Sequence, residues 1–254
     1  MDTSTKAKAE KAGTLKGVAF YTPTVLRLLY DRLVLGLYFS YAWRCPTKTE
    51  LIPFFNANSS PTEHTNDPST NSSPPRALLD IGVGTGYFLK HSPLTSINHL
   101  TLVDLNPACL DAAAARARKA HPSITCSTVY ADFLAPDGLC ASSVGEAKFD
   151  AISVMLLLHC LPGPPSRKAA ALIRLRDLLK KDGGVLFGAT ILGQGVTHNV
   201  FGRFLMWLHN RRGIFGNRED AAKSFMEPLE EAFEDVRWRL VGRVLLFEAR
   251  GPVV

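Results

Sequence analysis

Hydrophobic and polar positions change their spacing along the chain, and these changes mark the elements. Residues 17–55 carry apolar side chains at spacings of three and four, which predicts one or two amphipathic helices. From residue 76 onward, short apolar runs alternate with helical patterns. The runs predict strands at 77–82, 99–105, 124–131 and 183–192, a strand that runs into a helix start at 149–158, and two more strands within 236–250 around Gly242. The segments between them predict helices at 85–91, 107–120, 166–180, 198–210 and 219–232.

Alternation of this kind is typical of an α/β fold with an open, mostly parallel sheet that helices cover on both faces. The last two strands are separated by too few residues for a helical crossover, so they must run antiparallel to each other. In the helix at 166–180, the spacing places Ala170, Ile173, Leu175 and Leu178 or Leu179 on the inward face. The sequence therefore predicts a doubly wound α/β domain.

Local composition divides the chain into four parts. Residues 1–16 are polar and rich in lysine and alanine, which predicts a flexible tail. Residues 17–55 form the predicted helical segment, and residues 76–254 form the α/β domain. Residues 56–75 are rich in serine, threonine, asparagine and proline without apolar periodicity, which predicts a disordered loop.

Overall composition narrows the class of protein. Hydrophobic residues make up 46% of the 254 residues, which is typical of a globular chain. The longest apolar runs, 33–43 and 151–158, fall well short of the roughly 20 residues that cross a bilayer. The first residues lack the apolar core of a signal peptide, so we expect a cytoplasmic protein without a membrane span. The five cysteines are scattered without a CxxC pair, which predicts reduced thiols and no metal site.

The net charge of +6 does not indicate a nucleic-acid partner. Nucleic-acid binding would need a basic stripe interleaved with aromatic side chains on one face. The basic residues here occur as scattered pairs, such as Arg211 and Arg212, which predicts solvated surface charge. The pattern leaves the oligomeric state open.

A glycine-rich turn carries the first candidate chemistry. The run DIGVGTG (80–86) follows a predicted strand and opens a helix, where glycines let a ligand approach the backbone and the helix N-terminal amides. Its spacing, with Gly82, Gly84 and Gly86, is one residue shorter than the Gly-x-Gly-x-x-Gly turn of dinucleotide-binding proteins. Asp80, two residues before the first glycine, is a further distinguishing feature of the turn.

Acidic and apolar residues end the next three strands. A carboxylate at Asp104 can accept hydrogen bonds from both hydroxyls of a ribose. Asp132 can accept an adenine amino group, and the ring of Phe133 can stack on adenine. Met155 and Leu156 offer apolar contacts to the same ligand. Because the ends of parallel strands converge on one crevice, the sequence predicts a nucleoside site there.

From about residue 76 to residue 250, the chain resembles the class I S-adenosylmethionine-dependent methyltransferases. The matching runs are LLDIGVGTG (78–86) for their first motif, VDLN (103–106) for their ribose-binding motif, YADF (130–133) for their adenine-binding motif and LKKDGGVLFGA (179–189) for the approach to their fifth strand. The resemblance implies a Rossmann-like, seven-stranded sheet whose last strand is antiparallel, with S-adenosylmethionine as cofactor. It also implies that Asp80 and the glycine turn face the methionine part, and that Asp104, Leu105 and Asn106 hold the ribose.

A narrower resemblance covers nearly the whole chain. The runs YDRLVLG, YAWRCP, HCLPG and FGATILG resemble a group of small fungal methyltransferases of secondary metabolism. This implies methyl transfer to oxygen, nitrogen or carbon of a small hydrophobic metabolite. Two alternatives stay open. One is a methyltransferase-like cyclase, or pericyclase, that binds S-adenosylmethionine without transferring its methyl group, and the other is a non-catalytic module that binds it to regulate a partner.

The candidates on the acceptor side lie in two places. His159, just past the fourth strand, is the candidate general base, with packing at a helix start as the alternative. His198, Phe201 and Trp207 belong to an aromatic segment after the fifth strand, which we expect to form a substrate wall unless it is ordinary core packing. In related methyltransferases a helix before the first motif closes the crevice, so residues 17–55 are predicted to form an N-terminal helical lid with Tyr21 touching the substrate.

Overall fold

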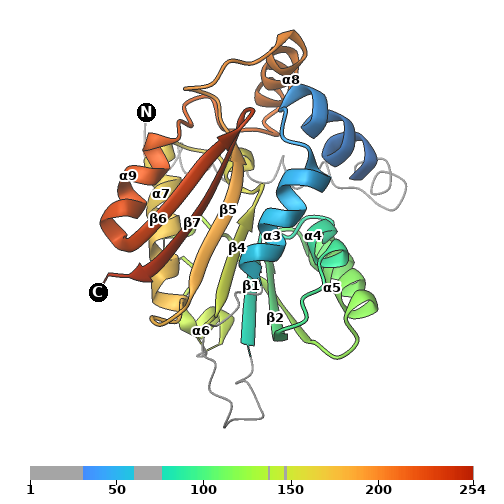
Figure 1. Ribbon diagram of the computed structural model, residues 1–254, viewed down its shortest axis with the longest axis vertical. Coiled ribbons are helices and arrows are strands. Elements are labelled where there is room, and N and C mark those ends of the chain that lie inside the picture. Colours follow the sequence, from blue (N-terminus) through green and yellow to red (C-terminus); the bar gives the residue numbers. More distant parts are fainter. Residues whose placement is uncertain (1–30, 60–75, 137, 146–147, 254) are drawn as a thin grey trace.

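The computed structural model describes residues 31–59, 76–136, 138–145 and 148–253, and seven strands in these ranges form one sheet (Figure 1). The strands are β1 (Arg76–Ile81), β2 (Ile97–Asp104), β3 (Thr125–Tyr130), β4 (Ala151–Met155), β5 (Val185–Ile191), β6 (Phe233–Val241) and β7 (Val244–Pro252). Their order is β3-β2-β1-β4-β5-β7-β6. Strands β1 to β5 pair in parallel, and β7 runs antiparallel to both β5 and β6. The predicted Rossmann-like sheet with its antiparallel last strand is therefore confirmed.

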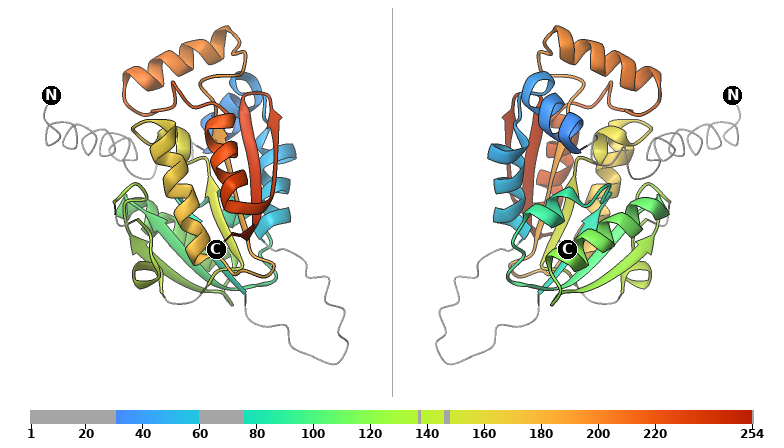
Figure 2. Two further views of the ribbon diagram at one scale, coloured as in Figure 1. Left: turned by 90° about the vertical axis from the view of Figure 1, so that its left-hand side faces the viewer. Right: turned by 90° about the vertical axis from the view of Figure 1, so that its right-hand side faces the viewer.

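Helices cover both faces of this sheet, as Figure 2 shows. One face carries α3 (Ile52–Ser59), α4 (Tyr87–His91) and α5 (Pro107–Ala120), and the other carries α7 (Pro165–Arg174) and α9 (Lys223–Ala232). Each face has its own hydrophobic cluster. Every residue of β4 and β5 is buried, which explains their continuous apolar runs, because a central parallel strand is covered on both sides. No helix in the described parts of the chain is long and apolar enough to cross a bilayer.

Two elements lie near the end of the sheet at which the parallel strands stop. Helix α8 (Val200–Arg211) crosses this end after β5, and η1 (Asp31–Ala42) lies beside it (Figure 1). The winding of η1 is that of a π-helix, so apolar residues four apart share one face. Leu35, Phe39 and Trp43, which follow this spacing, are all buried.

The segment predicted as a lid does two things in the structure. Its first part, η1, packs on α8, while η2 (Thr47–Leu51) leads into α3, which covers β4 and β5. In α3, the ring of Phe55 meets that of Phe187 edge-on at 5.6 Å. Helix α3 is therefore a layer of the fold rather than a cover for the crevice. Residues 1–30, with the predicted tail and Tyr21, lie outside the described residues.

Two of the predicted boundaries are corrected first. Helix α3 continues to Ser59, four residues into the predicted loop at 56–75, because the Asn58 side chain bonds to both Phe54 and Arg250. Residues 60–75 lie outside the described residues. The helix predicted at 166–180 ends at Arg174 and continues as the tighter turn η4 (Leu175–Leu178).

The predicted inward face of that helix is confirmed at Leu175, Leu178 and Leu179 and wrong at Ala170. In α7, Ala170 is exposed, whereas Lys168, Ala169 and Leu172 are buried. The helix predicted at 219–232 begins at Lys223, because the preceding residues form a loop that Lys168 holds in place. The burial of Lys168, which holds that loop, is a feature that apolar spacing alone does not predict.

Candidate functional site

The glycine turn joins β1 to α4 through three left-handed residues. The φ angles of Gly82, Gly84 and Gly86 are +73°, +51° and +70°, a region that favours glycine. A Cβ on Gly82 would lie 2.7 Å from a methyl of Leu157, and one on Gly86 would lie 2.7 Å from the Cα of Ala113. A Cβ on Gly84 would meet nothing within 4 Å. The outer glycines are thus required by packing, while the middle one borders open space that a ligand can approach.

Asp104, at the end of β2, connects the second predicted motif to this turn. Its Oδ2 accepts a hydrogen bond from the Gly84 amide at 3.2 Å, and its Oδ1 accepts one from the Asn106 amide at 2.9 Å. Burial raises the pKa of Asp104, while these amide donors lower it. Asn106 in turn caps α5 by accepting from the Ala108 amide at 3.0 Å. The structure therefore brings together Asp104, Asn106 and the glycine turn, as the sequence predicts.

Asp80 lies buried at the end of β1, directly before the turn. Burial raises its pKa from the ordinary 3.8 to about 6, and the negative charge of Asp104 adds to the rise. A buried carboxylate beside a second one is stabilised in its charged form by a nearby cation. This pair therefore suits a ligand with positive charge, such as one carrying a sulfonium or an ammonium group.

Replacing Asp80 with asparagine is expected to stabilise the free protein at about pH 8 by about 1–3 kcal/mol. Between pH 3.8 and about pH 6, Asp80 binds more protons in the folded state than in the unfolded state. The contribution of Asp80 to stability therefore falls as the pH rises through that range. Asparagine carries no charge and avoids this loss. Urea denaturation of both proteins at about pH 8 and about pH 4 measures it. If the two proteins differed equally in free energy of unfolding at both pH values, the raised pKa of Asp80 would be contradicted.

The ends of β3 and β4 hold the predicted adenine contacts. Asp132 is half-buried, and its Oδ1 accepts from the Leu134 amide at 2.9 Å. Phe133 is only 5% exposed and packs in the core against α7, which leaves its ring little surface for stacking. Met155 is buried, while Leu156 is half-buried and adopts a left-handed φ of +59°. Leu105, which follows Asp104, is also half-buried.

His159 lies in a short turn, η3 (Leu158–Cys160), after β4. The side chain is buried, and its Nδ1 has no hydrogen-bond partner among the described residues. Burial lowers the pKa of His159 to about 3, and Lys168 and His209 act in the same direction. Its ring meets that of Phe215 edge-on at 4.7 Å. His159 is therefore a neutral imidazole with an unused nitrogen, two residues after Leu157, whose side chain packs on Gly82.

Aromatic rings from η1, α8 and the loop after α8 gather beside His159. Phe215 stacks on His209 with centroids 4.7 Å apart, and Trp43 lies 6.1 Å from Phe215. Further pairs join His198 to Trp43 at 5.9 Å and Phe201 to Tyr38 at 5.8 Å. We call this group the aromatic cluster; its members are Tyr38, Trp43, His198, Phe201, His209 and Phe215.

The aromatic cluster agrees only in part with the predicted substrate wall. His198 and Phe201 belong to it, but Trp207 does not, because it lies on the outer face of α8 and is 54% exposed. There the guanidinium carbon of Arg211 lies over the Trp207 ring, 5.6 Å from its centroid. Sequence reasoning missed Phe215, which lies in a loop between glycines and has no periodic signal.

Comparisons with known proteins show the family of the chain. Residues 79–186 match a protein-family model described as a methyltransferase domain. The chain is 42% identical over 234 residues to methyltransferase verB of Penicillium polonicum, covering 88% of this chain and 93% of that protein. It is 40% identical over 240 residues to the physcion biosynthesis cluster O-methyltransferase of Aspergillus chevalieri, covering 94% and 96%.

A solved structure supports the fold. An O-methyltransferase family protein from Burkholderia thailandensis aligns with a TM-score of 0.52 at 16% identity, covering 70% of this chain and 52% of that one. The relatives named above match along nearly their whole length, and the open space at Gly84 and the carboxylates of Asp80 and Asp104 fit the nucleoside and the cationic end of a sulfonium cofactor. The chain therefore belongs to the class I S-adenosylmethionine-dependent methyltransferases, with S-adenosylmethionine as its cofactor and with relatives in fungal secondary metabolism.

Proposed function

We propose that the protein methylates an acidic hydroxyl, a phenol or an enol, on a small, flat and hydrophobic metabolite. The observation that carries this proposal is the aromatic cluster beside a buried, neutral His159. Flat apolar rings bind well between aromatic side chains, and a single polar group among them fixes the orientation of a hydroxyl. The relative from Aspergillus chevalieri, named an O-methyltransferase, supports oxygen as the attacked atom. A cytoplasmic location and the lack of a nucleic-acid partner stay predictions.

The cofactor supplies an electrophilic methyl carbon on its sulfonium. In our proposal Asp80 and the glycine turn hold the methionine part, and the residues that follow hold the nucleoside. Asp104, Leu105 and Asn106 contact the ribose, and Asp132, Met155 and Leu156 border the adenine. Phe133 is not part of this proposal, because its ring is buried in the core. Alignment of the acceptor oxygen with the methyl carbon can then supply roughly 7–11 kcal/mol of the barrier reduction.

His159 orients the acceptor hydroxyl rather than carrying its proton away. An imidazole whose pKa is about 3 is too weak a base to deprotonate a phenol of pKa about 10 at useful cost. Its Nδ1, which has no partner among the described residues, can donate a hydrogen bond to the ionised acceptor oxygen when this nitrogen carries the ring proton. An acceptor that ionises readily on its own therefore fits this site better than an alcohol. His198 and Phe201 line the acceptor side, and Tyr21 is placed there by the sequence prediction alone.

Replacing His159 with leucine is expected to lower kcat about 10- to 100-fold, the effect of losing one orienting hydrogen bond. Activity should rise with pH through the pKa of the acceptor, with no inflection near pH 6.5 from the histidine, since its pKa is about 3. Initial rates with 4-hydroxycoumarin as probe measure both effects, and His99→Leu, at an exposed histidine, is the control. An inflection near pH 6.5 that disappears in His159→Leu would instead make His159 a proton-carrying base.

The proposed activity is tested by following the methyl group. Purified protein is mixed with methyl-labelled S-adenosylmethionine and with 4-hydroxycoumarin, 2-naphthol or an extract of cells that lack the protein. A labelled methyl ether, with an equal amount of S-adenosylhomocysteine, supports the proposal. A labelled amine or carbon product would replace oxygen as the attacked atom. A metabolite that changes its retention without gaining mass or label would establish the cyclase, and cofactor binding without any product would favour the regulatory module.

A further inference from the structure

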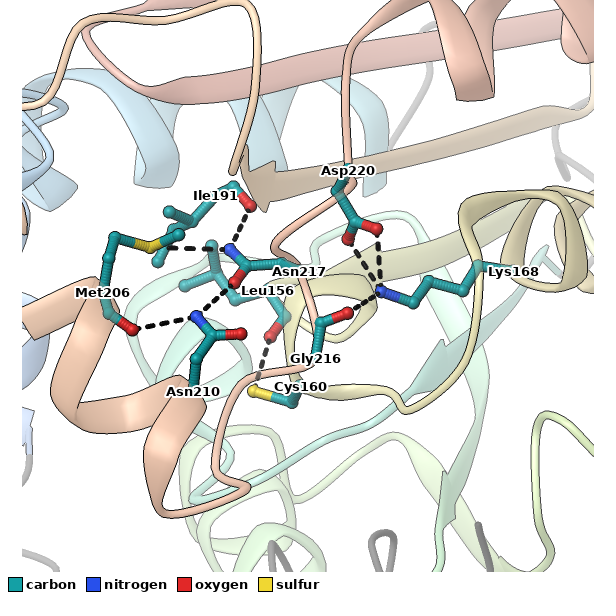
Figure 3. A network of polar contacts seen from close by, with 9 residues as sticks. All are labelled: Leu156, Cys160, Lys168, Ile191, Met206, Asn210, Gly216, Asn217 and Asp220. Atoms are coloured by element: carbon teal, nitrogen blue, oxygen red, sulfur yellow. Dashed lines mark hydrogen bonds and ion pairs between the residues drawn. The ribbon is translucent and has the colours of Figure 1, made fainter. Parts of the chain in front are cut away.

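A buried ion pair lies behind the aromatic cluster and has no role in the chemistry described so far. Lys168 of α7 and Asp220, in the loop before α9, both have side chains that are 0% exposed. The Lys168 Nζ donates to Asp220 Oδ1 at 2.9 Å, to Asp220 Oδ2 at 2.8 Å and to the Gly216 carbonyl at 2.9 Å (Figure 3). These three bonds use every proton of the ammonium group, so the pair is fully satisfied.

The loop that receives these bonds also carries Phe215. Beside Phe215, the Gly216 amide donates to the His159 carbonyl at 2.9 Å. A Cβ on Gly216 would lie 2.3 Å from the Leu161 carbonyl oxygen, so only glycine allows this approach. The backbone of Phe215 is thus held between η3 on one side and the ammonium group of Lys168 on the other.

Asn217 fixes the same loop to two further elements. Its Nδ2 donates to the Ile191 carbonyl at the end of β5 at 2.8 Å, and its Oδ1 accepts from Asn210 of α8 at 3.1 Å (Figure 3). The loop therefore contacts β5, α7, α8 and η3 through polar bonds.

Asp220 also joins the two ends of the segment 193–220, which contains α8. Its carbonyl accepts from the amides of Gly193 and Gln194, both at 3.0 Å, where the chain leaves β5. A Cβ on Gly193 would lie 1.9 Å from the Asn217 carbonyl oxygen, which again requires glycine. Residues 193–220 thus begin and end at one point, and the side chain of Lys168 anchors that point to α7.

Stability alone is a weak reason for such a pair. Burial lowers the pKa of Lys168 and raises that of Asp220, so desolvation opposes both charges even though their mutual attraction favours them. Buried pairs of this kind can often be replaced by apolar side chains with little loss of stability, or with a gain. What apolar side chains cannot reproduce is the set of directed bonds that places Gly216 and Asp220.

We propose that Lys168 and Asp220 are positioning residues, which hold Phe215 between His159 and His209 and so set the shape of the acceptor site. The stacking of Phe215 on His209 and its edge contact with His159, both at 4.7 Å, leave little freedom for the loop to shift. The inference rests on the proposed function, because it assumes that the acceptor binds at the aromatic cluster.

The kinetic test replaces the pair with apolar side chains in Lys168→Met/Asp220→Leu. The KM for 4-hydroxycoumarin is expected to rise at least about tenfold. The KM for S-adenosylmethionine should stay within about twofold, because the glycine turn belongs to other elements, β1 and α4. The matched control is Lys180→Met, which breaks the 2.8 Å pair with Asp150 at the opposite end of β4. Both KM values of the control should stay within about twofold of the unchanged enzyme. Equal changes in the two KM values, or no change in either, would overturn the proposal.

A second measurement needs no acceptor. With 4-fluorophenylalanine in place of Phe215, the ¹⁹F resonance reports the ring contacts with His209 and His159. The double variant is expected to shift or broaden this resonance, and Lys180→Met is expected to leave it unchanged. If the enzyme methylates none of the probes, the proposed function fails, yet the resonance still decides whether the pair positions Phe215. An unchanged resonance in the folded double variant overturns the inference.

Discussion

Replacing Asp104 with alanine is expected to weaken binding of S-adenosylmethionine roughly 30- to 1,000-fold. In the proposed site, Asp104 accepts two charge-assisted hydrogen bonds from the ribose, and losing them is expected to cost on the order of 2–4 kcal/mol. The substitution also removes the acceptor for the amides of Gly84 and Asn106, so the glycine turn and the start of α5 lose their common partner. Isothermal titration calorimetry with S-adenosylmethionine measures the affinity.

The control for this prediction is Asp111→Ala, which removes an exposed aspartate from the same helix, α5. Its affinity for the cofactor should match that of the unchanged protein. Thermal unfolding of Asp104→Ala without cofactor separates a binding defect from a folding defect. An affinity equal to that of the control would remove Asp104 from the ribose site.

Gly86→Ala is expected to lose mainly stability, and Gly84→Ala is expected to lose mainly affinity for the cofactor. At Gly86, the left-handed φ of +70° and the Ala113 Cα at 2.7 Å act together. Left-handed strain of about 1–2 kcal/mol and overpacking of about 1–3 kcal/mol should together lower the free energy of unfolding by about 2–5 kcal/mol. At Gly84, the strain is similar, but the new methyl group meets no atom within 4 Å. Gly84→Ala should therefore stay folded and lose at least about tenfold in cofactor affinity, because the methyl group enters the ligand's space.

Urea denaturation and calorimetry on both variants test this contrast, and each variant serves as the control for the other. Equal losses of stability would show that packing against Ala113 is not what requires Gly86. Full cofactor affinity in Gly84→Ala would place the ligand away from the middle of the turn.

The parts of the fold that local patterns determine could be predicted from the sequence. Helix α5 has the predicted bounds, 107–120, because Asn106 caps it, Pro107 suits its first turn and alanines fill its buried face. The runs of β4 and β5 are apolar throughout because both faces of these strands are covered. The glycine turn was recognisable because three left-handed positions leave glycine as the only residue without strain.

The parts that depend on distant contacts could not be predicted in this way. Lys168 is buried only because Asp220, 52 residues later, lies within 2.8 Å, and no local pattern contains that partner. The spacing of α8 shows an aromatic stripe, but it does not show that Phe201 contacts Tyr38 of η1, because that partner lies far away in the sequence. Phe133 follows a strand end, as an adenine contact would, but the packing of α7 buries its ring.

The segment 193–220 leaves the sheet after β5 and returns to the same point. There the amides of Gly193 and Gln194 donate to the Asp220 carbonyl. A segment whose two ends are already joined can change its length and composition without moving the strands on either side of it. Related enzymes can therefore differ between residues 193 and 220 by insertions, deletions or exchange of the whole segment. The strands that carry the glycine turn, Asp80 and Asp104 stay in place. Evolution of this lineage can thus diversify the metabolites it modifies by rewriting one excursion of the chain.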